Sequence, residues 1–256
     1  MGRIDRLILY GTFALLLPSG AALAADASEM PYQPTATPYE FGSGWYLRGD
    51  IGYKIYNVPH AHFDVAGYGN MIGDTLSNTG VAGLGFGYKF NDWFRTDITV
   101  DYEAPGHFHG RLPCPSVTCV PVPQFSDEFA DISAWTTLVN AYFDLPLFAE
   151  GPTGLTPYVG AGIGAADLMT SNVHFINPDG STGVWPGGSQ WNFAWSLTAG
   201  VSYGFTKNFL LDVNYRYVNL GDAVSGPTLP QFGNQPIHYD NIHANEFRVG
   251  LRYLIN

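Results

Sequence analysis

The sequence predicts an all-β protein, an eight-stranded antiparallel up-and-down barrel whose strands cross a membrane. Three observations lead to this fold. Eight segments alternate apolar and polar side chains with a period of two, the pattern of a strand with two unlike faces. Short and long connections follow one another between these segments. The charged residues within the segments gather on one face and carry both signs.

The first 24 residues predict a secretory signal peptide. Arg3 and Arg6 precede the apolar run LILYGTFALLL, and the small residues 22–24 match a cleavage site. The run is shorter than the roughly 20 residues of a membrane-spanning helix, although an uncleaved anchor is the alternative. Residues 25–43 hold three prolines and no alternation, so we expect an extended N-terminal segment there and the barrel over 44–256.

The first four segments differ in what fills their polar face. Charged side chains alternate with apolar ones in the first and third, whereas glycine alternates with Ala82, Leu84 and Phe86 in the second. The fourth places Trp135 and Val139 on one face. These segments are WYLRGDIGYKIY (45–56), GVAGLGFGYKF (80–90), WFRTDITVDYE (93–103) and DISAWTTLVNAYFDL (131–145).

The last four segments repeat the pattern. The sixth alternates most regularly, with Phe193, Trp195 and Leu197 opposite Ser196 and Thr198. Each segment is long enough for the 9 to 11 residues of a tilted membrane-spanning strand. They are TPYVGAGIGAADLM (156–169), QWNFAWSLTAGVSYGF (190–205), NFLLDVNYRYVNL (208–220) and EFRVGLRYLI (246–255).

The connections alternate in length. Two are tight turns, at 91–92 and 206–207, and LFAEGPTGL between the fourth and fifth segments is moderate. Short turns at one end and long loops at the other are typical of outer-membrane barrels, whose long loops face the outside. An even strand number closes the sheet and returns both ends to the periplasm. The predicted long extracellular loops are 57–79, 104–130, 170–189 and 221–242.

The charged face distinguishes a membrane barrel from a soluble β-sandwich, in which that face would meet water. Six basic and five acidic residues share the inner parity, a near balance that predicts ion pairs, since isolated buried charge is costly. The predicted network of the barrel lumen comprises Arg48, Asp50, Lys54, Arg95, Asp97, Asp101, Asp212, Arg216, Glu246, Arg248 and Arg252.

Glycine and aromatic residues support the same interpretation. Glycines on the inner face of 80–90 and 156–169 make room for bulky arginine and tyrosine side chains in a narrow barrel. Aromatic residues near strand ends are typical of girdles at the membrane interfaces. The predicted girdle residues are Trp45, Tyr56, Tyr88, Phe90, Trp93, Tyr102, Trp191, Phe205, Phe209 and Tyr217.

Several motifs together resemble one protein family. WYLRGDIGY, WFRTDITVDYE, NAYFDL, PYVGAGIGAA and the terminal FRVGLRY are similar to the small outer-membrane barrel proteins of alphaproteobacteria, porin-like surface proteins, and more distantly to the transmembrane domain of OmpA. The resemblance covers residues 44–256. It implies the outer membrane of a Gram-negative bacterium, with membrane lipid, lipopolysaccharide and the barrel assembly machinery as partners.

Two cysteines, Cys114 and Cys119, stand close together in LPCPSVTCV. An exported chain meets an oxidising compartment, where such a pair predicts a disulfide, and no further ligands accompany it as a metal site would need. The formal net charge of −11 argues against nucleic acid as a partner.

The seven histidines fall in the predicted loops or at strand edges. His60, His62, His107 and His109 offer four imidazoles for a zinc or copper ion, but solvated side chains are the favoured interpretation, so we predict no metal and no cofactor. We find no serine and histidine at neighbouring strand positions for a lipid deacylase, and the chain is two strands short of an omptin protease. The sequence therefore predicts a protein without enzymatic activity.

Two functions fit such a barrel. One is a structural barrel that supports the envelope and presents long loops to the surroundings, including a host or phage ligand. The other is a narrow channel for small solutes. Because an eight-stranded lumen is just wide enough for its own side chains, and the predicted ion pairs would fill it, we favour the structural barrel.

Overall fold

The computed structural model describes residues 44–114, 123–145, 148–150 and 153–255. The predicted signal peptide and N-terminal segment lie outside this range and stay predictions. The predicted disulfide also stays a prediction, because Cys119 falls in the gap after residue 114. Within the described residues, no helix has the length and apolar character to cross a membrane.

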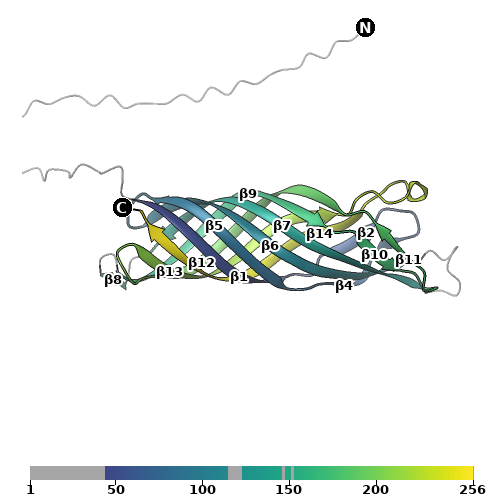
Figure 1. Cartoon of the computed structure of the whole chain (residues 1–256), viewed down its shortest axis with the longest axis horizontal. Coiled ribbons are helices and arrows are strands. Elements are labelled where there is room, and N and C mark those ends of the chain that lie inside the picture. The colour runs from purple at the N-terminus through teal and green to yellow at the C-terminus, as the bar shows by residue number, and fades with distance from the viewer. Residues whose placement is uncertain (1–43, 115–122, 146–147, 151–152, 256) are drawn as a thin grey trace, which may run out of the picture. The chain divides into compact units, whose positions relative to one another are not determined.

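Eight long strands form a closed antiparallel ring, as the sequence predicts (Figure 1). Each strand pairs with the next, and the last pairs with the first, with Tyr46 opposite Leu254. Closure leaves no unpaired backbone edge in the hydrocarbon. In ring order the strands are β1 (Trp45–Tyr56), β5 (Thr79–Lys89), β6 (Phe94–Pro113), β7 (Phe125–Asp144), β9 (Thr153–Thr170), β12 (Gly188–Gly204), β13 (Phe209–Val224) and β14 (Ile237–Leu254).

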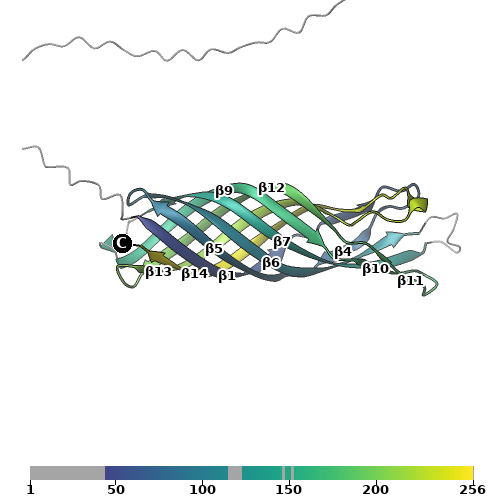
Figure 2. The ribbon, with the colours of Figure 1, turned by 45° about the horizontal axis from the view of Figure 1, so that its top comes forward.

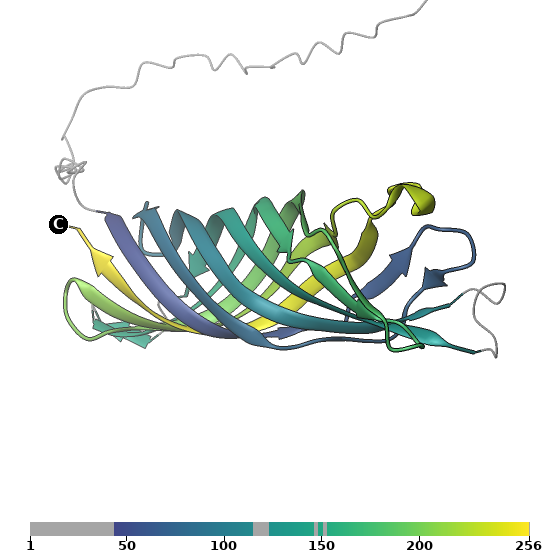
Figure 3. The ribbon, with the colours of Figure 1, turned by 45° about the vertical axis from the view of Figure 1, so that its right-hand side comes forward.

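Shorter elements extend the ring at its two ends. β8 (Phe148–Glu150) pairs with β9 at the end with short turns. At the other end β2 pairs with β14, β4 with β6, and the β10–β11 hairpin with β7 (Figures 2 and 3). The elements at this end are β2 (His60–Phe63), β3 (Gly69–Asn70), β4 (Ile72–Leu76), β10 (Val173–Ile176), β11 (Thr182–Trp185) and the 3-10 turn η1 (Pro230–Phe232).

The bounds that we predicted for the four long loops were therefore too wide, because strands continue into them. β6 continues to Pro113 and β7 begins at Phe125, so most of 104–130 is strand. β14 likewise begins at Ile237, inside the predicted loop 221–242. Many of the described residues that we assigned to loops belong to strands, which extend the barrel.

One-residue irregularities hid this extension from the pattern of the sequence. In β6, the two residues between Glu103 and Gly106 oppose one residue of β7, a β-bulge that contains Pro105. The inner face of β6 passes from odd to even residue numbers across this bulge. Gly221 in β13 and Asn241 in β14 adopt left-handed backbone conformations at similar shifts of register. A change of phase beside a proline resembles the end of a strand.

The polar and apolar faces of the sheet change places at the level of these register irregularities. Below it, apolar side chains point outward and are largely exposed, such as Ile51 and Leu84 at 70% and 72%. Above it, Phe108 and Leu112 point inward, while His107 is exposed. An apolar exterior suits lipid and a polar exterior suits water, so the exchange marks the outer boundary of the membrane.

An aromatic girdle lies at this boundary and another near the short turns. The rings of Tyr102 and Trp135 lie 4.9 Å apart at the upper level, and Trp93 stacks on Phe143 at the lower one. Tyr56 does not belong to a girdle, contrary to our prediction. It has the inner parity of β1, is buried, and lies 3.4 Å from Glu103.

The part of the chain beyond the upper girdle is called the outer extension below. It comprises residues 57–79, 104–114, 123–134, 168–190 and 219–243.

Glycine on the inner face of β5 is required by the side chains opposite. A Cβ atom at Gly83 would overlap the carboxylate of Asp101 and the guanidinium of Arg248. Gly80, on the outer face of the same strand, has only the carbonyl oxygen of Gly52 nearby, at 3.9 Å.

We therefore expect Gly83→Val to lower the free energy of unfolding by about 1–3 kcal/mol through overpacking. Gly80→Val should change it by less than about 0.5 kcal/mol. Urea unfolding in lipid vesicles, followed by tryptophan fluorescence, measures both. Equal stability of the two variants would show that the lumen has spare room at this level.

Candidate functional site

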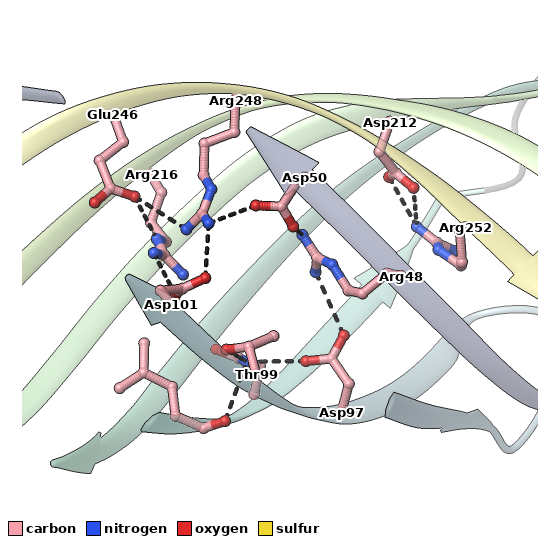
Figure 4. Close-up of polar contacts among 12 residues, drawn as sticks. Arg48, Asp50, Asp97, Thr99, Asp101, Asp212, Arg216, Glu246, Arg248 and Arg252 are labelled. Atoms are coloured by element: carbon pink, nitrogen blue, oxygen red, sulfur yellow. Dashed lines mark hydrogen bonds and ion pairs between the residues drawn. The ribbon is translucent and has the colours of Figure 1, made fainter. Parts of the chain in front are cut away.

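The lumen within the membrane holds all of the charged residues that the sequence places there. They come mainly from β1, β6, β13 and β14, which lie on one side of the ring and supply both signs of charge. Each of these residues makes at least one ion pair, and Figure 4 shows most of them.

The centre of the network is Arg248. Its guanidinium contacts three carboxylates: Asp50, Asp101 at 2.7 Å and Glu246 at 3.3 Å. Arg216 contacts two of these three carboxylates, with Nη2 2.7 Å from Asp101 and Nε 2.7 Å from Glu246 (Figure 4). Two planar guanidinium groups thus share two carboxylates, an arrangement that uses the forked donors of arginine.

Lys54 extends the network toward the outer end. Its ammonium group lies 3.2 Å from Glu246 and also contacts Glu103. Glu103 further accepts a hydrogen bond of 2.8 Å from the hydroxyl of Thr136. Lys54 and both glutamates are fully buried.

Arg48 connects the central group to the periplasmic half. It lies 2.9 Å from Asp50 and 3.4 Å from Asp97, and donates a hydrogen bond of 2.9 Å to the Tyr142 hydroxyl. The amide of Asn140 donates to the other oxygen of Asp97 at 2.9 Å. The carboxylates are thereby held by both charged and neutral donors.

Two further pairs close the periplasmic end. Arg95 donates from Nε to Asp144 at 3.0 Å, and its guanidinium carbon lies 3.9 Å from the centre of the Tyr142 ring, a cation–π contact. Arg252 donates to Asp212 at 2.8 Å. All four charged residues are buried.

Sequence reasoning missed Glu103 and Asp144. Glu103 is the last residue of a predicted segment and Asp144 the next to last, and we did not extend the alternation that far. Glu103 shares the odd parity of Asp101, and Asp144 shares the even parity of Asn140. Extending the alternation of inward and outward residues to the end of each segment would have found both.

An apolar core lies on the outer side of the charged lumen, and the sequence did not predict it. Phe108, Ile132, Leu168, Val218 and Tyr239 belong to this cluster, which continues into the outer extension. Each is at most 2% exposed. The bore therefore carries two layers in series, one of ion pairs and one of hydrocarbon.

The histidines lie on strands, which corrects their predicted place in loops. They do not assemble the four-imidazole site that we considered. His62 stacks on His238 with ring centres 4.9 Å apart, whereas His107 and His109 bond to Asp131 and Asp127 respectively.

One group among the described residues has ligand atoms close enough for a metal ion. His62, Asp64 and His238 offer atoms within 4.8 Å of one another. Asp64 is exposed, and His62 also lies 3.0 Å from Asp240. The observed contacts are those of a partly exposed cluster of ion pairs and stacked rings.

Comparison with known proteins agrees with this geometry. Residues 12–253 match the model of the family described as outer membrane protein beta-barrel domain. The chain belongs to this family. It is a protein of the Gram-negative outer membrane.

Three relatives illustrate the range of the family. An uncharacterised protein of Brucella melitensis is 36% identical, over 93% of this chain and 94% of its own length. Outer membrane protein PagN of Salmonella typhimurium is 26% identical over 82% and 89% respectively. A Rickettsia conorii protein, named as a candidate adhesin, is 24% identical over 96% and 98%.

The central arginine provides a test of the network. Arg248→Ala leaves three buried carboxylates short of a donor, and breaking a buried pair costs about 3–5 kcal/mol. Lys89→Ala removes only an ion pair with the exposed Asp92, at 3.6 Å, which should cost less than about 1 kcal/mol. Urea unfolding of both variants in vesicles measures the difference. A loss for Arg248→Ala no greater than that for Lys89→Ala would show that the network does not stabilise the barrel.

Proposed function

We propose that the protein is a closed outer-membrane barrel that contributes to the envelope and holds its outer extension in place for contacts at the cell surface. The observation that carries the first part is the burial of the lumen. The side chains of Lys54, Arg95 and Glu246 have no surface accessible to a water-sized sphere. A lumen filled by enclosed side chains offers no open path for a hydrated solute.

The alternative function is a narrow channel for small solutes. It requires both the ion pairs and the apolar core to move out of the lumen. The ion pairs hold their charges by several short contacts each, and unpairing them in a low-dielectric lumen is costly. The apolar core beyond them is mainly hydrocarbon and replaces little of the water around a passing solute. The geometry therefore favours the closed barrel.

The outer extension supports the second part of the proposal. It continues the ring as paired strands, so its shape is set by the same hydrogen bonds as the barrel. A rigid scaffold that presents polar groups to the surroundings is the arrangement that binding surfaces commonly use. The family includes a candidate adhesin that aligns over 96% of this chain.

The charge of the outer extension indicates which partners it favours. Arg111 is its one basic residue other than histidine among the described residues. An acidic surface attracts basic partners and repels phosphate and sulfate groups, unless divalent cations intervene. A contact with lipopolysaccharide stays part of the proposal in that mediated form. The carboxylates are Asp64, Asp74, Asp127, Glu128, Asp131, Asp179, Asp222 and Asp240.

The proposal assigns no catalytic role. Of the relatives described above, those with informative names are called an outer membrane protein and a candidate adhesin. The charged residues of the lumen are enclosed, so a substrate has no access to them.

Conductance in planar bilayers tests closure. We expect the refolded wild type to be silent. Arg95→Ala with Arg248→Ala should also be silent, because the apolar core remains, and adding Ile132→Ser and Leu168→Ser should produce conducting events. A heat-modifiable gel shift confirms that each variant is folded. Steady ion-selective steps from the wild type would establish the channel instead.

Binding to immobilised polymers tests the surface charge. Protein in nanodiscs should bind poly-lysine more tightly than heparin, because the outer extension is acidic. Asp64→Asn with Asp179→Asn, both at exposed positions, should weaken poly-lysine binding, and added salt should weaken it further. Lys207→Gln, in a turn at the opposite end, is the control. Preferential binding to heparin would contradict the assignment of a basic partner.

A further inference from the structure

A cavity of about 260 Å³ lies within the outer extension. Its walls come from elements far apart in sequence: β2, β6, β7, β10, β11 and the turn η1. The hairpins at this end of the barrel and η1 are visible together in Figure 2. The cavity lies beyond the upper girdle, since Glu128 in its wall is seven residues, or roughly 23 Å of strand, beyond Trp135.

Five aromatic side chains form a connected wall of the cavity. The ring of Phe232 lies 5.9 Å from Tyr68 and 5.6 Å from Trp185, at nearly right angles to both. Phe63 contacts Tyr68 at 5.5 Å, and Phe175 stacks on Trp185 at 4.7 Å. Aromatic faces carry negative charge density and attract cations, so such a wall favours a positively charged guest.

Glu128 is the charged residue of the cavity. It is 1% exposed, and its Oε1 accepts a hydrogen bond of 3.0 Å from the hydroxyl of Ser126. Its Oε2 has no hydrogen-bond partner. No ion pair to Glu128 occurs within the part of the chain that the structure describes. A buried carboxylate oxygen without a donor is costly, and a bound donor would remove that cost.

The groups around Glu128 reinforce the preference for a cation. Burial raises the pKa of Glu128 to about 7, and the negative charge of Asp127 adds to the rise. Burial likewise raises the pKa of Tyr68 and Tyr239, and the charge of Glu128 adds to both. Asp74 also acts on Tyr239, and its Oδ1 and the Tyr239 hydroxyl likewise lack partners. The surroundings therefore contain acidic and neutral groups, and the basic Arg111 lies instead over the ring of Phe125.

We propose that this cavity binds a small alkylammonium ion, with its N–H groups donating to Oε2 of Glu128 and its carbon chain against the aromatic wall. A carboxylate or phosphate ligand would meet like charge. A neutral apolar ligand would leave Oε2 without a donor, and a quaternary ammonium has no N–H to supply one. The inference goes beyond the proposed function and does not depend on whether the lumen conducts.

Isothermal titration calorimetry with n-pentylammonium tests the site, using the full barrel in nanodiscs of phosphatidylcholine and phosphatidylglycerol, lipids without a primary amine. At pH 8 we expect n-pentylammonium to bind at least tenfold more tightly than n-pentanol, n-pentanoate or tetramethylammonium. Equal binding of pentanol would overturn the ionic recognition. Equal binding of tetramethylammonium would overturn the hydrogen bond to Glu128.

Variants locate the binding. Glu128→Gln keeps the shape of the side chain and removes its charge, so affinity should fall at least tenfold. Asp131→Asn is the matched control, because this side chain on the outer face of β7 pairs with His107 and does not line the cavity. It should leave affinity within about twofold. Trp185→Leu removes part of the aromatic wall and should also weaken binding. This variant tests the site if Glu128→Gln does not show the gel mobility of the folded barrel. Unchanged affinity in both Glu128→Gln and Trp185→Leu would place the ligand elsewhere.

The affinity should also depend on pH. Below pH 7 Glu128 becomes protonated, whereas n-pentylammonium stays charged, so affinity should rise on the order of tenfold between pH 5.5 and pH 8. The rise should disappear in Glu128→Gln and persist in Asp131→Asn. A flat profile in the wild type would contradict recognition by the ionised carboxylate.

Discussion

An eight-stranded ring has an interior that its own side chains must fill, and the rest of this structure depends on that constraint. Lipid outside the ring requires apolar side chains there, so the alternate residues of every strand must point inward together. At the level of the membrane these residues are charged, and low solvent access requires each charge to have a partner. The glycines of β5 and β9 follow from the same constraint, because side chains of neighbouring strands occupy the space beside them: Arg48 and Arg248 at β5, Asn140 and Tyr142 at β9.

The constraint explains why the membrane part was readable from the sequence. Period-two alternation located all eight ring strands, and parity placed residues as distant as Arg48 and Arg248 in one lumen. Parity cannot say which carboxylate meets which arginine, since that depends on the stagger between strands. The shared contacts of Asp101 with Arg216 and Arg248, residues more than a hundred positions away, are of this kind.

The outer extension was not readable in the same way. Its inner face carries Phe108, Ile132 and Tyr239, but the shift at Pro105 breaks the alternation that would have revealed the strand. The cavity was equally hidden, because Phe63, Glu128, Trp185 and Phe232 come from four separate elements with no spacing that relates them. The available signal was one acidic residue, Glu128, among small and apolar side chains of the same face in SDEFADIS. That signal does not identify the other residues of the cavity.

The bulge in β6 also has a consequence for how such chains can diverge. The bulge places one extra residue in β6, so deleting that residue would restore regular pairing and leave Phe108 facing inward. Deleting one residue between the bulge and Phe108 would instead turn Phe108 toward water. Insertions or deletions of one residue in the regular parts of the strands are thus disruptive, whereas changes in the tips of the hairpins leave the pairing beneath them intact. The membrane band and the outer extension can evolve at different rates, provided that the length of the junction between them is kept.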